Sequence, residues 1–136
     1  MDLSKIHAVI ADDDIIKAFE IRRALEYSGI TDVDIVSDQE KLWERIYGNG
    51  QNERKPDLIV TDMQYSLTAG ADVDKEAGFK LMERMEKEHI CIPIIICSSG
   101  YYENVPGVLG TVWYTGRRDI NPDFKGVLGT LKPSVS

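Results

Sequence analysis

The sequence predicts a three-layer α/β/α domain in which helices cover both faces of a parallel sheet. Three short and almost wholly apolar runs lie at 8–11, 58–61 and 94–97, and segments with helical spacing of apolar residues separate them. Such runs are typical of strands that are buried on both faces, as the strands of parallel sheets are. Strand and helix patterns alternate along the chain, which favours right-handed crossovers and a doubly wound sheet.

The first half of the chain predicts two strand-helix units. After the first strand, helical spacing runs from Ile15 to Tyr27, and Ser28-Gly29 ends this helix. Its apolar stripe is predicted to comprise Ile15, Ala18, Phe19, Ile21, Ala24 and Leu25. A short second strand ends at Val36, and an amphipathic helix is expected over 38–47.

The third strand is predicted at 57–62, and a helix marked by Phe79, Leu81, Met82 and Met85 is expected after it. Between these two elements, the polar segment 64–76 predicts a long loop beside the ligand edge of the sheet.

The fourth strand is predicted at 92–98 and the fifth at 111–115. Proline and glycine interrupt the segment between them, so the fourth helix of this architecture is expected to be short, irregular or missing. A last helix, begun by Asn121-Pro122-Asp123, is expected to reach Leu131.

Oxygen-bearing side chains follow three of these strands. A flavodoxin-like strand order, 2-1-3-4-5, would place strands one and three at the topological switch point, where Asp12, Asp13 and Asp62 would converge. Clustered carboxylates repel one another unless a cation neutralises them, and oxygen ligands favour Mg²⁺, Mn²⁺ or Ca²⁺. The sequence therefore predicts a metal-dependent acidic site suited to phosphate chemistry.

Length and charge narrow the function classes. The 136 residues predict a single domain over 1–136 with no output domain, and the net charge of -7 argues against non-specific nucleic-acid or anionic-membrane partners. Cys91 and Cys97 have no histidine at metal-ligand spacing and are expected to be reduced thiols in the core. With neither a signal-peptide pattern nor a membrane-length apolar run, the expected location is cytoplasmic.

Three motifs in the same order resemble the receiver domain of bacterial two-component response regulators. Residues 9–14 (VIADDD) are similar to the acidic pair of that family after strand one, and 56–63 (PDLIVTDM) to its phospho-acceptor strand. Residues 92–98 (IPIIICS) are similar to its strand ending in a switch Ser or Thr. Each motif alone is weakly specific for the family, but the three together in this order are strongly specific. The resemblance extends over 6–131.

The resemblance implies that Asp62 is the phospho-acceptor, taking a phosphoryl group from a histidine kinase or a phosphotransfer protein. Mg²⁺, or Mn²⁺ in its place, would be bound by Asp13, Asp62 and the main-chain carbonyl of Gln64, with Asp12 assisting through water. Such a protein signals by binding another protein, and its chemistry is limited to its own phosphorylation and dephosphorylation. The downstream partner is not specified, and homodimer formation is left open.

The resemblance also implies a switch. Ser98 would be its hydroxyl and Tyr114 its aromatic side chain on strand five. The family carries a lysine at the end of that strand, where this chain has Trp113 to Asp119 without a lysine. Arg117 is the expected replacement, and Arg118 competes with it because either guanidinium could bind phosphate.

Two other functions stay open from the sequence. The missing lysine is compatible with a pseudo-receiver that binds partners without being phosphorylated. The segment 12–16 also fits loosely the start of haloacid dehalogenase-type phosphatases, in which Asp12 would be the nucleophile and Asp14 the acid. That second alternative gives Asp62 no role.

Overall fold

The protein is described here by a computed structural model that defines residues 2–48 and 54–131. Its centre is a five-stranded parallel sheet with the order β2-β1-β3-β6-β7. In chain order the strands of this sheet are β1 (His7–Ala11), β2 (Asp32–Val36), β3 (Leu58–Thr61), β6 (Ile94–Ser98) and β7 (Gly110–Trp113). This order confirms the flavodoxin-like topology predicted from the sequence.

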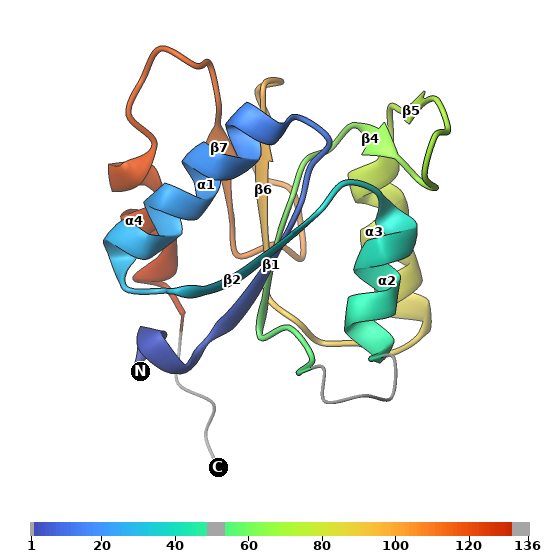
Figure 1. Cartoon of the computed structure of the whole chain (residues 1–136), viewed down its shortest axis with the longest axis horizontal. Coiled ribbons are helices and arrows are strands. Elements are labelled where there is room, and N and C mark those ends of the chain that lie inside the picture. The colour runs from blue at the N-terminus through green and yellow to red at the C-terminus, as the bar shows by residue number, and fades with distance from the viewer. Residues whose placement is uncertain (1, 49–53, 132–136) are drawn as a thin grey trace.

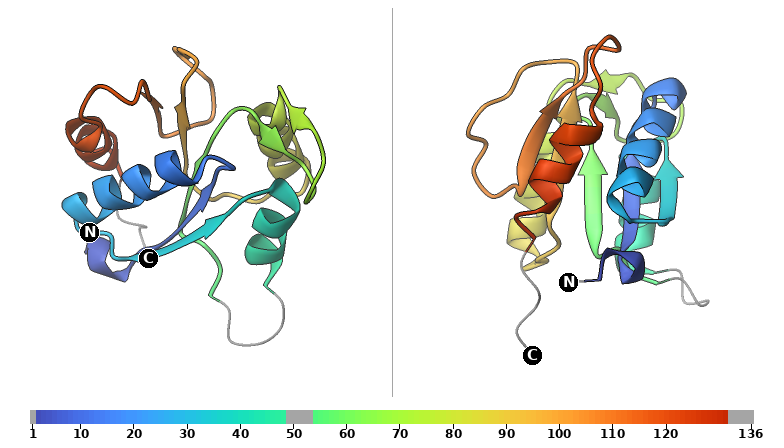
Figure 2. Two further views of the ribbon diagram at one scale, coloured as in Figure 1. Left: turned by 45° about the horizontal axis from the view of Figure 1, so that its top comes forward. Right: turned by 90° about the vertical axis from the view of Figure 1, so that its left-hand side faces the viewer.

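Helices cover both faces of the sheet (Figure 1). A short 3₁₀ helix, η1 (Leu3–Lys5), precedes β1. One face carries α1 (Ile15–Ser28) and α4 (Asn121–Leu128), while α2 (Gln39–Tyr47) and α3 (Ala77–Lys87) pack on the other. Figure 2 shows α1 and α4 side by side in front of the sheet. The three layers predicted from the sequence are therefore present.

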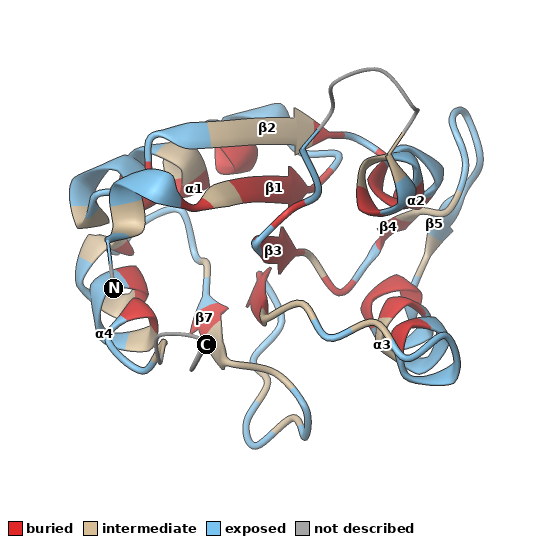
Figure 3. Cartoon of the chain, turned by 90° about the horizontal axis from the view of Figure 1, so that it is seen from below, coloured by how far each residue is buried: buried red, intermediate tan, exposed pale blue. Residues whose placement is uncertain are grey.

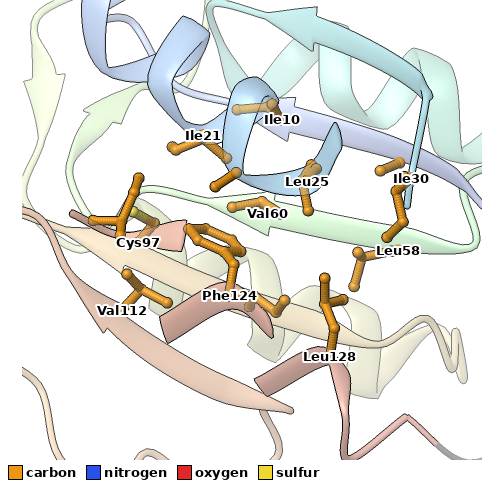
Figure 4. Packing of buried hydrophobic residues seen from close by; sticks show 14 of the residues in the cluster. Ile10, Ile21, Leu25, Ile30, Leu58, Val60, Cys97, Val112, Phe124 and Leu128 are labelled. Carbon is orange, nitrogen blue, oxygen red and sulfur yellow. The ribbon is translucent and has the colours of Figure 1, made fainter. Parts of the chain in front are cut away.

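The core consists of two apolar clusters, one on each face of the sheet. Alternate strand residues point to opposite faces, so Ile10 and Val60 meet α1 and α4, whereas Val9 and Ile59 meet α2 and α3. Figure 4 shows the first cluster closing around Phe124. Strands β3 and β6 are buried throughout, as is β1 after His7, and the outer faces of the helices are exposed (Figure 3).

The first turn of α1 differs from the prediction. Ile15 and Phe19, which were expected on the buried stripe, are 65% and 49% exposed. The buried side of the helix instead comprises Lys17, Ala18, Ile21, Ala24 and Leu25. The reason is the phase of the helix: residues 17, 21 and 24 share one face, and residue 15 lies away from it.

The segment 64–76 also differs from the predicted loop. It contains a two-stranded antiparallel hairpin of β4 (Tyr65–Ser66) and β5 (Val73–Asp74). The hairpin is held to the domain through Tyr65, which is completely buried although its neighbours are polar. The Tyr65 hydroxyl has hydrogen-bond partners, as that of a buried tyrosine usually does, and the Leu67 carbonyl accepts from the Glu40 N–H of α2.

Three other sequence predictions concern the second half of the chain. The segment between β6 and β7 contains no helix, so the fourth helix of this architecture, expected to be short, irregular or missing, is missing. The last helix is shorter than predicted, since α4 ends at Leu128. Cys97 is buried as expected, but the prediction for Cys91 is wrong, because this residue is exposed in the segment that precedes β6. Within the described residues, no helix is long and apolar enough to cross a membrane.

Candidate functional site

Three aspartates meet at the carboxyl edge of the sheet, the upper edge in Figure 1. Asp12 and Asp13 follow β1, and Asp62 follows β3, which pairs directly with β1. One carboxylate oxygen of each lies within 4.8 Å of the others. The structure thus brings together the three acids that the sequence placed at the switch point.

The three carboxylates differ in burial and in how the backbone holds them. The Asp12 side chain is 0% exposed and that of Asp62 is 14% exposed, whereas Asp13 lies at the surface. Asp12 Oδ1 accepts a hydrogen bond from the Asp14 N–H at 2.9 Å, and Asp62 Oδ1 accepts one from the Met63 N–H at 2.7 Å. The main chain therefore fixes one oxygen of each buried or half-buried acid.

The remaining oxygens of Asp12 and Asp62 share a single cation. Lys17 Nζ lies 2.9 Å from Asp12 Oδ2 and 3.1 Å from Asp62 Oδ2, and the Lys17 side chain is only 4% exposed. Asp14 begins α1 by accepting hydrogen bonds from the N–H groups of Ile16 and Lys17. This cap places Lys17 in the first turn, on the buried side of the helix and facing the acids.

Sequence reasoning missed Lys17, although one signal could have found it. The buried stripe of α1 is fixed by Ala18, Ile21 and Ala24, and residue 17 lies four positions before Ile21 and seven before Ala24. A lysine on the buried face of a helix that begins beside an acidic pair needs a charged partner.

The three carboxylates of the cluster carry more negative charge than the single ammonium of Lys17 can neutralise. Burial raises the pKa of Asp12 to about 6, and the neighbouring Lys17 offsets this only in part. Burial also raises the pKa of Asp13. Burial alone would lower the pKa of Lys17, but the charges of Asp12 and Asp62 outweigh it and raise that pKa. Three carboxylates thus face one ammonium that stays protonated.

The donor set fits a hard divalent cation. All three side-chain ligands are carboxylate oxygens, which suit Mg²⁺ and Mn²⁺. Apart from its ion pair with Lys17, the buried Asp12 Oδ2 has no hydrogen-bond donor among the described residues. Gln64, whose carbonyl was the fourth expected ligand, is an exposed residue two positions after Asp62.

The two predicted switch residues lie at the ends of neighbouring strands. Ser98 ends β6 and is buried, and its hydroxyl accepts a hydrogen bond from the Gly100 N–H at 3.2 Å. Tyr114 follows β7, and Lys17 Nζ lies 5.8 Å from the centre of its ring. Burial and a hydrogen bond with Glu20 raise the pKa of Tyr114 to about 12, so its hydroxyl stays neutral.

The arginines after β7 lie elsewhere. Arg118 donates to the Trp113 carbonyl at 2.8 Å and pairs with Asp123 at 2.7 Å, which ties the end of β7 to α4. Arg117 is exposed, and its main-chain N–H donates to Thr115 Oγ1. Among the described residues neither arginine forms an ion pair with the three acids, so no contact favours Arg117 as the replacement for the family lysine. The cation in contact with them comes from α1.

A buried chain of hydrogen bonds, not anticipated from the sequence, supports the acceptor strand. Thr61 Oγ1 lies 2.8 Å from the Asp62 carbonyl oxygen, which can only accept, so Thr61 donates there and accepts from the Tyr65 hydroxyl at 2.9 Å. Tyr65 in turn accepts from Gln39 Nε2 at 3.3 Å, and the same nitrogen donates to the Ala77 carbonyl at 2.8 Å. The chain links α2, the hairpin and α3 to the backbone of Asp62.

Comparison with solved structures identifies this architecture. The phosphorylated cyanobacterial phytochrome response regulator RcpA superposes with a TM-score of 0.68 at 18% identity, covering 93% of this chain and 96% of its own. The bacteriophytochrome response regulator RtBRR superposes with a TM-score of 0.70 at 16% identity, covering 96% and 81%. The fold is that of a response regulator receiver domain.

Other comparisons agree with this or are silent. The N-terminal domain of a three-domain response regulator, sensory box and GGDEF protein from Carboxydothermus hydrogenoformans gives a TM-score of 0.60 at 21% identity, covering 90% of both chains. No protein-family model matches the sequence, and no curated protein matches it. This sequence thus shares the receiver fold with structures to which it is only 16–21% identical.

Proposed function

We propose that this protein is a phosphorylation-controlled signalling receiver in which Asp62 accepts a phosphoryl group from a histidine kinase or a phosphotransfer protein. The observation that carries the proposal is the position of Asp62 in the acidic cluster. Asp62 is partly exposed at the carboxyl edge of a receiver fold, whereas Asp12 is enclosed beneath it. Asp62 is therefore the inner carboxylate that a phosphodonor can reach.

The proposal includes Mg²⁺, or Mn²⁺ in its place, held by Asp12, Asp13 and Asp62 with the main-chain carbonyl of Gln64. A bound divalent ion would neutralise the oxygens of the incoming phosphoryl group, whose negative charge otherwise repels a carboxylate. The fit rests on the three clustered carboxylates and their excess of negative charge.

The chain's own residues have defined tasks in this reaction. An oxygen of the Asp62 carboxylate forms the new bond to phosphorus while the bond from phosphorus to the donor breaks, and the donor leaves with that electron pair. The Met63 N–H and the hydrogen-bond chain from Thr61 hold Asp62 in place during the transfer. The Ser98 hydroxyl oxygen accepts a hydrogen bond from the Gly100 N–H, and this bond does not use the hydroxyl proton. Ser98 would therefore donate a hydrogen bond to the phosphoryl group.

The signal would then pass to a partner protein through a change near Tyr114. The Tyr114 side chain interacts with Glu20 of α1, and the centre of its ring lies 5.8 Å from Lys17 Nζ. A phosphoryl group on Asp62 adds negative charge next to Lys17, so it can favour one of two arrangements of these side chains.

A phosphatase with Asp12 as nucleophile is less well supported. The Asp12 carboxylate is completely buried, and its only oxygen outside the Asp14 hydrogen bond faces Lys17. A nucleophile in that position could not approach a phosphate ester without opening the site. The pseudo-receiver is favoured by a different observation, namely that among the described residues neither Arg117 nor Arg118 forms an ion pair with the acidic cluster.

The test is intact-mass analysis after incubation with Mg²⁺ and acetyl phosphate. We expect one phosphoryl group on the wild-type protein, none on Asp62→Asn and none when a chelator removes the metal. Asp72→Asn is the matched control, since it removes one exposed negative charge and should be labelled like the wild type. Equal labelling of Asp62→Asn would refute the proposal, and no labelling of any folded protein would favour the pseudo-receiver.

A further inference from the structure

We propose that Lys17 is the ammonium that binds the phosphoryl group on Asp62, and that it also weakens metal binding at the acidic cluster. This inference rests on the proposed function. In the receiver family the phosphate-binding lysine lies at the end of strand five, whereas here Lys17 would bind the phosphoryl group from the first turn of α1. The observation behind it is a buried lysine between the two inner acids, in a chain that has no lysine after β7 before α4.

A purely stabilising role accounts poorly for this lysine. Burying an ion pair has a large desolvation penalty, and well-packed apolar residues in its place are often equally or more stabilising. The neighbours of Lys17 on the buried side of α1, Ala18 and Ile21, show that the helix packs by apolar contacts. A buried ammonium in contact with the acceptor carboxylate therefore indicates a role in the phosphorylation of Asp62.

The geometry suits phosphoryl binding. Asp62 Oδ1 is held by the Met63 N–H, so Oδ2, which contacts Lys17 at 3.1 Å, is the oxygen without a backbone partner. An ammonium has three N–H donors, and Asp12 and Asp62 account for two of them. The third donor remains for an oxygen of a phosphoryl group attached to Asp62.

The same contacts place Lys17 in competition with a metal. The ammonium lies against oxygens of two of the three carboxylates that would bind the cation. Its positive charge repels a divalent ion at short range, in a partly buried site where screening is weak. Removing the charge should therefore raise metal affinity while slowing phosphorylation. A lysine that served only the stability of the fold would not move these two quantities in opposite directions.

The test compares Lys17→Met with Arg117→Met, which removes the same charge from the residue expected on sequence grounds to bind phosphate. Calorimetric titration of the unphosphorylated proteins with MgCl₂ should show about tenfold or greater tightening for Lys17→Met and no change for Arg117→Met. Labelling by acetyl phosphate at saturating Mg²⁺, followed by intact mass, should be about 100-fold slower for Lys17→Met, as for the loss of one oxyanion donor.

A second variant guards against a failure to fold. Lys17→Arg keeps the charge but replaces a compact ammonium by a planar fork, so it should fold and bind Mg²⁺ like the wild type while being labelled about tenfold more slowly. Wild-type labelling rates in Lys17→Met or Lys17→Arg would overturn the inference, as would unchanged Mg²⁺ affinity in a folded Lys17→Met. These outcomes can be told apart from a failure of the proposed function, because in that case the wild-type protein itself would not be phosphorylated.

Discussion

Replacing Gly78 by alanine should disturb the backbone that carries the acceptor. Gly78 is the second residue of α3 and is buried, and its N–H donates to the Met63 carbonyl at 3.0 Å. A Cβ at this position would lie 2.7 Å from Met63 Sδ, 3.1 Å from Met63 Cα and 3.2 Å from the Asp62 carbonyl oxygen. The sulfur could turn aside only within a fully buried side chain, and the other two atoms are main chain.

The size of the effect follows from two opposing contributions. Forcing extra volume into a packed core typically costs about 1–3 kcal/mol. Alanine in place of glycine in a helix gains up to about 1 kcal/mol from its higher helix propensity. With the full helix-propensity gain, we therefore expect Gly78→Ala to lower the free energy of unfolding by up to about 2 kcal/mol and to slow labelling of Asp62.

The control is Gly126→Ala in α4, where a Cβ would meet nothing within 4 Å. This variant should be more stable than the wild type by about 0.5–1 kcal/mol, because only the helix-propensity gain applies. Urea unfolding of the three proteins, followed by circular dichroism, measures both changes. If Gly78→Ala is stabilised as much as Gly126→Ala, the close packing of α3 on the acceptor segment is refuted.

Two further predictions concern the buried polar groups. Tyr65→Phe removes the hydroxyl between Thr61 and Gln39 and should lower the urea midpoint by an amount equivalent to about 1–3 kcal/mol; an unchanged midpoint would show that this chain of hydrogen bonds does not stabilise the fold. The pKa of Asp12 is raised from 3.8 to about 6 in the folded protein, so the folded state binds the proton more tightly than the unfolded state does. The contribution of Asp12 to stability is therefore lost as the pH rises from 3.8 to about 6. In metal-free buffer, the free energy of unfolding of Asp12→Asn should accordingly increase relative to that of the wild type over this pH range. A difference between the two proteins that does not change with pH would contradict the raised pKa of Asp12.

The sheet could be predicted because its signals are local. The apolar runs of β1, β3 and β6 can be satisfied only by burial on both faces, and an acid at the end of each of two neighbouring strands must reach the same edge. The convergence of Asp12, Asp13 and Asp62 follows from these two facts once strands one and three are neighbours, as they are in the flavodoxin-like order.

The features that sequence reasoning missed depend on the phase of a helix or on distant partners. Ile15 and Phe19 fit a helical stripe as well as Ala18 and Ile21 do, so the apolar pattern by itself leaves two faces of the helix as candidates for burial. The face that is buried in the structure includes Lys17. Tyr65 likewise gives no local strand signal, because its hydroxyl partners come from elements that lie before it in the chain.

Whether Asp62 is the phospho-acceptor is tested most directly by locating the phosphoryl group in the chain. Borohydride reduces an acyl phosphate and converts a phosphorylated aspartate to homoserine, which peptide mass analysis can place. After incubation with Mg²⁺ and acetyl phosphate, we expect homoserine at position 62 and aspartate unchanged at positions 12 and 13. Homoserine at position 12 with aspartate unchanged at position 62 would identify Asp12 as the nucleophile and would exclude Asp62 as the acceptor.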